Sequence, residues 1–278
     1  MTLFMLNLLK KPLSSMLLVS TTLILSACGG GDSSSVSPMT TWSFSGSNGP
    51  EFWHLVVDRN GEPYTTCKYG QRQSPINITA ASLSPLDLPN VDFQYQPTAV
   101  KSTTLGFGIY GFDLQEEPTH NAIVVNGVKS ELQQIHLHTP SDHQIDGKPY
   151  DGAIHFVHKD TTGAYTFVAV LLQVGASNEN IATLIDHLPD SVLLAEIPEF
   201  SFDLTTLLPP ESQRASYRYS GSFTTPACAE NVNWIIMQTP IEFSQKQLAV
   251  FQTLFDGNTR PIQQLNDRTI EADTTPSI

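Results

Sequence analysis

The sequence predicts a β-rich α/β domain with a few short helices at its periphery. Apolar and polar residues alternate over many short runs, which is the pattern of half-buried strands. The clearest runs are 122–128, 132–138, 153–158, 165–174 and 232–238, and turn-rich segments such as 118–121 and 146–149 separate them. Two stretches, 178–188 and 244–255, have helical spacing of apolar residues instead, and they begin at Asn178 and Ser244, which can cap a helix.

The composition fits one globular domain. Of the 278 residues, 40% are hydrophobic and 15% are charged, so the chain can bury a core. Between Trp42 and about Asp273 there is no second composition shift, internal repeat or block of charge, and we therefore place a single domain at 41–274. The net charge of −13 argues against nucleic acid as a partner, because binding phosphates requires clustered Lys and Arg. The oligomeric state stays open.

Residues 1–27 have the features of a targeting segment rather than of a folded element. Lys10 and Lys11 precede an apolar stretch that is too short and too rich in Ser and Thr for a comfortable membrane span. The ending Leu-Ser-Ala-Cys at 25–28 resembles the lipobox of bacterial lipoproteins, which would imply cleavage before Cys28 and a lipid on its sulfur. An ordinary secretory signal followed by a coincidental cysteine is the alternative.

The residues after Cys28 have the composition of a flexible tether. Gly and Ser dominate this stretch, which we place at 28–40. Removal of residues 1–27 takes away two lysines and no acid, so the net charge changes from −13 to −15. We therefore expect an acidic, exported protein that faces the periplasm or the cell surface and contacts the membrane by its lipid anchor only.

A histidine cluster has the spacing of a metal site. In a strand, the two-residue period places His136 and His138 on one face together with Gln134, and His155 lies in the next predicted strand. Three neutral imidazoles with a fourth position open suit catalytic Zn²⁺. The simpler alternative is that each histidine forms its own hydrogen bonds or is exposed to solvent, and that the three do not form a metal site. The di-zinc pattern His-x-His-x-Asp-His is not matched, because three residues separate His138 from Asp142. A cupin metal site also begins with His-x-His, but its second motif is not matched around 149–155, so it stays open as a weaker alternative.

Motifs in order along most of the domain resemble those of the α-class carbonic anhydrases. They are GPEFW at 49–53, QRQSPINI at 71–78, QIHLHTPSDH at 134–143, HFVHKD at 155–160, YSGSFTTP at 219–226 and NTRPIQ at 258–263. The resemblance implies a central, mostly antiparallel twisted sheet, zinc held by the three histidines, and reversible hydration of carbon dioxide to bicarbonate and a proton, which is a lyase reaction.

The same resemblance assigns roles around the metal. Gln134 would fix the tautomer of the first zinc histidine. Thr224 would orient the nucleophile, and Thr225 would border carbon dioxide and bicarbonate. Val157, and with it Trp234, would supply an apolar wall for an uncharged linear substrate. Cys67 would pair with Cys228 in a disulfide, which leaves Cys28 for the lipid and accounts for the odd number of three cysteines.

Five substitutions at the site depart from the family pattern. Asp142 stands where the family has the Glu that accepts the threonine proton, and Ala153 replaces a Glu that supports the third zinc histidine. Phe107 falls where a proton-carrying His is expected, and Phe167 replaces a Val that borders the substrate. Tyr110 falls where a small amide lines the cavity. We therefore expect a slow enzyme, with a catalytically weak, surface-tethered zinc or binding protein as the alternative.

Overall fold

The structure is a computed structural model, and it describes residues 39–106, 108–115, 120–188, 199–255 and 257–274. The predicted signal segment and nearly all of the predicted tether, including Cys28, lie outside these residues, and so does Phe107. The described residues belong to one compact unit. None of their helices combines the length and the apolar character needed to cross a bilayer.

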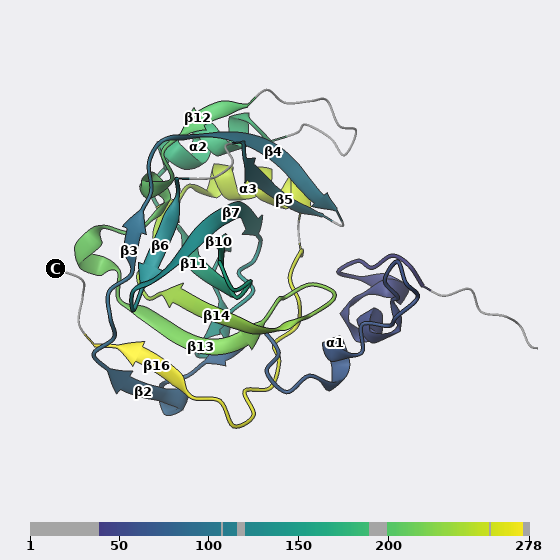
Figure 1. Cartoon of the computed structure of the whole chain (residues 1–278). Helices are drawn as coiled ribbons and strands as arrows, with labels where there is room; N and C mark the ends of the chain where they lie inside the picture. The colour runs from purple at the N-terminus through teal and green to yellow at the C-terminus, as the bar shows by residue number, and fades with distance from the viewer. Residues whose placement is uncertain (1–38, 107, 116–119, 189–198, 256, 275–278) are drawn as a thin grey trace, which may run out of the picture. The chain divides into compact units, whose positions relative to one another are not determined.

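A large twisted mixed sheet organises the described part of the chain (Figure 1). Its main path runs β12-β4-β5-β7-β10-β11-β14-β13-β16-β2, with β6, β3 and β15 attached at its side. The strands of this sheet are β2 (Leu83–Leu86), β3 (Asp92–Gln94), β4 (Thr98–Gly106), β5 (Ile109–Leu114), β6 (Ala122–Val125), β7 (Val128–His138), β10 (Gly152–Asp160), β11 (Tyr165–Val174), β12 (Phe200–Phe202), β13 (Ser216–Ser222), β14 (Glu230–Met237), β15 (Ile241–Phe243) and β16 (Ile270–Asp273).

Most strand pairs are antiparallel, which confirms the predicted fold class. Within the large sheet, the parallel exceptions are the pairs of β11 with β14, β11 with β15 and β16 with β2. A second, small sheet joins β1 (Asn77–Ile78), β8 (Gln144–Ile145) and β9 (Lys148–Pro149). The helices are α1 (Thr66–Tyr69), α2 (Glu179–Asp186) and α3 (Gln245–Phe255), and 3₁₀ turns span Gly46–Asn48, Pro50–Leu55, Ala80–Ser82, Leu204–Leu207 and Glu211–Gln213.

The two faces of the central strands are buried in different ways. On one face, Ile135 and Phe156 join a large apolar cluster that includes Leu184 of α2 and Phe251 of α3. Because side chains alternate along a strand, the neighbouring residues on β7 and β10 point to the opposite face. There they meet a second, smaller apolar cluster that contains Trp234. This second face carries the histidines.

One predicted strand is in fact two. The run 122–128 was expected to be continuous, but β6 ends at Val125 and β7 begins at Val128. Asn126 and Gly127 form the connection with φ values of 52° and 77°. An Asn-Gly pair is the strongest short signal for a tight hairpin turn, because both residues tolerate positive φ. The turn predicted at 146–149 is present between β8 and β9, with Asp146 and Gly147 at positive φ.

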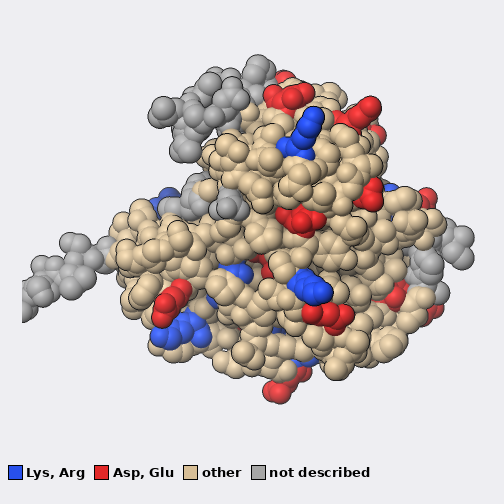
Figure 2. Space-filling view, turned by 180° about the vertical axis from the view of Figure 1, so that it is seen from behind, with Lys and Arg blue, Asp and Glu red and all other residues tan. Residues whose placement is uncertain are grey.

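Charged side chains are sparse on the face drawn in Figure 2. Lys, Arg, Asp and Glu stand there singly or in small mixed groups among uncharged residues. This agrees with a charged fraction of only 15%.

Candidate metal centre

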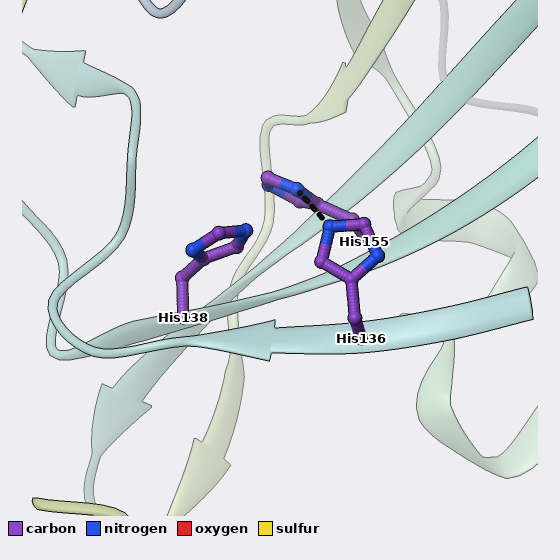
Figure 3. A group of neighbouring side chains, drawn as sticks. All are labelled: His136, His138 and His155. Carbon is purple, nitrogen blue, oxygen red and sulfur yellow. Dashed lines mark hydrogen bonds between the residues drawn. The ribbon is translucent and has the colours of Figure 1, made fainter. Parts of the chain in front are cut away.

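Three histidines converge on one face of the sheet. His136 and His138 lie at the end of β7, and His155 lies on β10, directly opposite His136 in the antiparallel pairing. The ring centroids are 5.1 Å apart for His136 and His138, 5.1 Å for His136 and His155, and 4.6 Å for His138 and His155. Figure 3 shows the three rings turned toward one another. One ligand nitrogen from each ring lies within 4.8 Å of the others, so the triad can hold a metal ion.

The surroundings keep the triad in the form that binds metals. Burial lowers the pKa of His136 well below its usual value, and the neighbouring His138 lowers it further. Burial also lowers the pKa of His155 well below its usual value, and His138 acts in the same direction. Neutral imidazole is the form that coordinates metals. The nitrogens available are His136 Nε2 and His155 Nδ1, which lie 3.3 Å apart, and His138 Nε2, since Nδ1 of His138 is 2.8 Å from the Asn258 carbonyl oxygen. A set of three nitrogens fits Zn²⁺.

The outer nitrogens of the triad are supported unequally. His138 is held by Asn258, whereas His136 Nδ1 and His155 Nε2 are buried and have no hydrogen-bond partner among the described residues. Gln134 Oε1, the acceptor expected for His136, is also buried without a partner. Near His155, Ala153 carries no polar group that could accept the Nε2 hydrogen. Two of the three rings therefore lack the second contact that normally orients a metal-ligating histidine.

A buried carboxyl group stands beside the triad. Asp142 Oδ2 lies 3.4 Å from His138 Nε2, and the backbone N–H of Arg260 donates to Asp142 Oδ1 over 3.3 Å. Burial raises the pKa of Asp142, while His138 and a side-chain hydrogen bond with Thr224 lower it. The shorter Asp side chain thus still reaches the threonine, which is buried just after β13. Thr225 follows and is half-buried.

Aromatic rings form an apolar wall next to the triad. The Phe167 ring centroid is 5.0 Å from that of Trp234 and 6.5 Å from that of His136, and Trp234 is 5.1 Å from His155. Phe223 adds a further ring 5.0 Å from Phe167. Val157 lies on the same face and is also buried. The structure thus brings together the residues expected to border an uncharged substrate, and Phe167 fills space where a smaller residue was expected.

A buried hydrogen-bond network behind the wall was not predicted. The Tyr219 hydroxyl lies 2.6 Å from His143 Nε2 and 2.8 Å from Ser74 Oγ, and the Ser222 N–H donates to Ser74 Oγ over 3.0 Å. Burial lowers the pKa of His143 to about 3. Each of these residues lies inside a quoted motif, but only the folded chain shows that they touch. The network fixes the strand that leads into Thr224.

The expected disulfide between Cys67 and Cys228 is present, with a Cα–Cα distance of 5.0 Å. It lies beside the buried guanidinium of Arg260, which donates to the Cys67 carbonyl oxygen over 2.6 Å and to the Ser74 carbonyl oxygen over 2.8 Å. The same residue holds Asp142 through its backbone. Arg260 therefore links the disulfide to the carboxyl group of Asp142, which in turn forms a hydrogen bond with Thr224.

The structure corrects one expectation about the cavity. Tyr110 pairs with Leu137, so it lies on the opposite face of the sheet from the triad. Its ring is buried and stacks on Phe255 at a centroid distance of 5.4 Å. Gly111 is the residue opposite His136, and an added Cβ there would clash with the Ile135 carbonyl oxygen, so this close approach of the strands requires glycine.

A twisted mixed sheet that holds three convergent histidines on one face defines a β-rich protein with a potential metal centre. The family model described as eukaryotic-type carbonic anhydrase matches residues 48–274. The chain belongs to this α-type carbonic anhydrase family.

Relatives with solved structures or curated descriptions agree with this assignment. The carbonic anhydrase of Nostoc sp. is 35% identical over 234 residues, covering 82% of this chain and 84% of that protein. The carbonic anhydrase of Klebsiella pneumoniae is 35% identical over 233 residues, covering 82% and 89%. The α-carbonic anhydrase of Thermovibrio ammonificans, solved with the inhibitor sulfanilamide, superposes with a TM-score of 0.75 at 35% identity, covering 84% of this chain and 99% of that one.

Proposed function

We propose that this protein catalyses the reversible hydration of carbon dioxide to bicarbonate and a proton, with Zn²⁺ held by His136, His138 and His155. The observation that carries the proposal is the buried triad, whose ligand nitrogens lie within 4.8 Å of one another in a chain of the carbonic anhydrase family. Bound zinc would supply a nucleophile at neutral pH by lowering the pKa of a coordinated water to about 7.

The protein's own groups position the reactants. Asp142 accepts a hydrogen bond from the Thr224 hydroxyl, which leaves the threonine oxygen as an acceptor for the nucleophile. Val157, Phe167 and Trp234 exclude water from one side, where an apolar linear molecule is favoured over a charged one. Thr225, next to Thr224, borders the same space and can bind the bicarbonate product.

Slow turnover is part of the proposal. The Phe167 ring reduces the space for the substrate beside Trp234. In the described part of the chain, His155 Nε2 has no hydrogen-bond partner to orient its ring. If both effects were severe, the protein would be a zinc-bearing binding protein instead. Stopped-flow hydration of carbon dioxide in concentrated buffer, with zinc analysis of the same sample, separates the two functions. Zinc near one ion per chain without turnover above the buffer blank would reject the enzyme.

We also propose export and lipid anchoring, which the Leu-Ser-Ala-Cys sequence at 25–28 and the following Gly- and Ser-rich stretch support. The protein would then act at the cell envelope, tethered through Cys28. Metabolic labelling with a radioactive fatty acid tests this. Label should enter the wild-type chain and be absent from Cys28→Ser, and equal labelling of both would reject the anchor.

A further inference from the structure

Asp113 places a half-buried carboxyl group on the same sheet face as the histidine triad. In the antiparallel pairing of β5 with β7, Asp113 lies opposite Gln134, and Gly111 lies opposite His136. Residues directly opposite one another in such a pair point to the same face. Asp113 is therefore a diagonal neighbour of His136, at a backbone distance of about 7–8 Å. One or two water molecules can span the remaining gap.

The groups that surround Asp113 leave it able to exchange protons. On β4, Lys101 lies opposite Asp113, and the Thr103 side chain forms a hydrogen bond with the carboxyl group. On β7, the neighbours are Gln134 and His136. Among the described residues, no ion pair within 4 Å involves Asp113. Burial raises the pKa of Asp113, and the Thr103 contact opposes this shift.

Hydration of carbon dioxide releases one proton in each turnover, and a titratable group near the site would speed removal of that proton when buffer is scarce. The residue at the position expected for a proton-carrying histidine is Phe107, whose phenyl ring cannot carry one. A buried acceptor with no partner, Gln134 Oε1, lies directly across from Asp113 and is suited to receive a hydrogen bond from a protonated carboxyl group.

We propose that Asp113 accepts the proton that hydration releases beside the histidine triad and passes it to solvent, an inference that rests on the proposed carbon dioxide hydration. In this step an O–H bond of the reacting water breaks, and the proton passes through bridging water to form an O–H bond with a carboxylate oxygen of Asp113. A buffer base then removes that proton and regenerates the carboxylate. No electrons are transferred, and the buffer carries the released proton away.

The chemistry predicts a working but inefficient relay. A carboxylate is a weaker base than the group that releases the proton at a pKa of about 7, so the transfer is uphill. Burial, which raises the carboxyl pKa, reduces this mismatch. Exogenous buffer should therefore compete well with Asp113, and the relay should matter most when buffer is scarce.

The test compares the full-length wild-type protein with Asp113→Asn in stopped-flow hydration at low and at high buffer concentration. We expect turnover of the variant to fall by about tenfold in low buffer and to stay within about twofold in high buffer. Zinc content and the near-ultraviolet circular dichroism spectrum should not change. Asp113→Glu, which keeps the carboxyl group, should restore most of the low-buffer rate.

His120→Gln is the matched control, because it removes an exposed titratable group from the segment that follows β5. Its low-buffer rate should equal that of the wild type. An Asp113→Asn rate unchanged in low buffer, an equal loss at both buffer concentrations, or a low-buffer loss in His120→Gln instead would each overturn the role of Asp113 while leaving the enzyme intact. A wild-type protein that is inactive in high buffer would reject the proposed function itself, and this inference with it.

Discussion

His155 faces His136 across the antiparallel pair of β10 and β7, and His155 Nδ1 lies 3.3 Å from His136 Nε2. Two unprotonated nitrogens at this distance would repel each other, so one must carry a hydrogen unless a cation lies between them. Burial disfavours charging either ring. A metal ion satisfies both nitrogens at once, and this relationship is the basis of the first prediction.

Zinc should stabilise the folded protein. An ion that binds only the native state at a thousand times its Kd adds about 4 kcal/mol to the free energy of unfolding. We expect the melting temperature to rise when zinc is added to chelator-treated protein, and His136→Ala to abolish both the rise and the hydration activity. His120→Ala, on an exposed residue, should behave like the wild type. A zinc response that persists in His136→Ala would place the ion elsewhere.

Ala153→Glu should slow the release of zinc. His155 Nε2 is buried without a partner, and the side chain at 153 points to the same face of β10 as His155. A carboxylate there would orient the ring and raise its basicity, an effect of about 10- to 100-fold in metal affinity. The measurement is zinc transfer to an excess of chelator. Ala153→Leu controls for added volume, and equal slowing in both variants would mean that hydrogen bonding to His155 is not responsible.

Phe167→Val should increase carbon dioxide hydration. The Phe167 ring packs on Trp234 and Phe223 beside the triad, and its removal opens space for the substrate. A change of this size in the volume of an apolar substrate pocket alters kcat/KM by about 10-fold or more, and here we expect an increase. The variant should also lose stability, by about 2–4 kcal/mol, because a cavity forms. Phe156→Val, buried on the opposite face, should lose stability without any gain in rate. A rate that falls in Phe167→Val would show that the ring is needed.

The disulfide should contribute strongly to stability. Cys67 and Cys228 are separated by 161 residues, and closing so long a loop stabilises a protein by about 4–5 kcal/mol in the chain-entropy model. We expect urea unfolding of the double variant Cys67→Ser and Cys228→Ser to give a free energy of unfolding that is lower by about 4–5 kcal/mol. Its hydration rate should fall as well, because Arg260 links the disulfide region to Asp142. An unchanged rate would show that the loop with Thr224 needs no such support.

The sequence predicts the strands that carry the three histidines better than it predicts which residues of neighbouring strands contact them. The alternation at 134–138 determines which side chains share a face, so the convergence of His136 and His138 followed from local pattern. The register of β5 against β7 did not, since a one-residue shift exchanges the two faces and depends on tertiary packing. The sequence alone therefore places Tyr110 in the cavity and gives no indication that Asp113 shares a face with the triad. The contacts of His143 with Tyr219 were equally hidden, because they join residues 76 positions apart.

The buried His158 should make the protein sensitive to acid. Its Nε2 lies 2.7 Å from the Tyr95 hydroxyl and its Nδ1 lies 3.2 Å from the Thr166 carbonyl oxygen, and burial lowers the pKa to about 3. The unfolded chain binds this proton near pH 6.5, so between pH 6.5 and 3 unfolding takes up a proton and stability falls as the pH decreases. The expected slope for one such group is about 1.4 kcal/mol per pH unit.

His158→Gln isolates this contribution, because the amide can still hydrogen-bond to Tyr95 but does not titrate. Urea unfolding of the chelator-treated wild type and variant at several values between pH 6 and pH 4 should give free energies whose difference narrows by about 1.4 kcal/mol for each unit of acidification. The triad histidines and His143 titrate in both proteins, so their effect cancels in the comparison. Parallel pH profiles for the two proteins would mean that His158 is already protonated in the folded state.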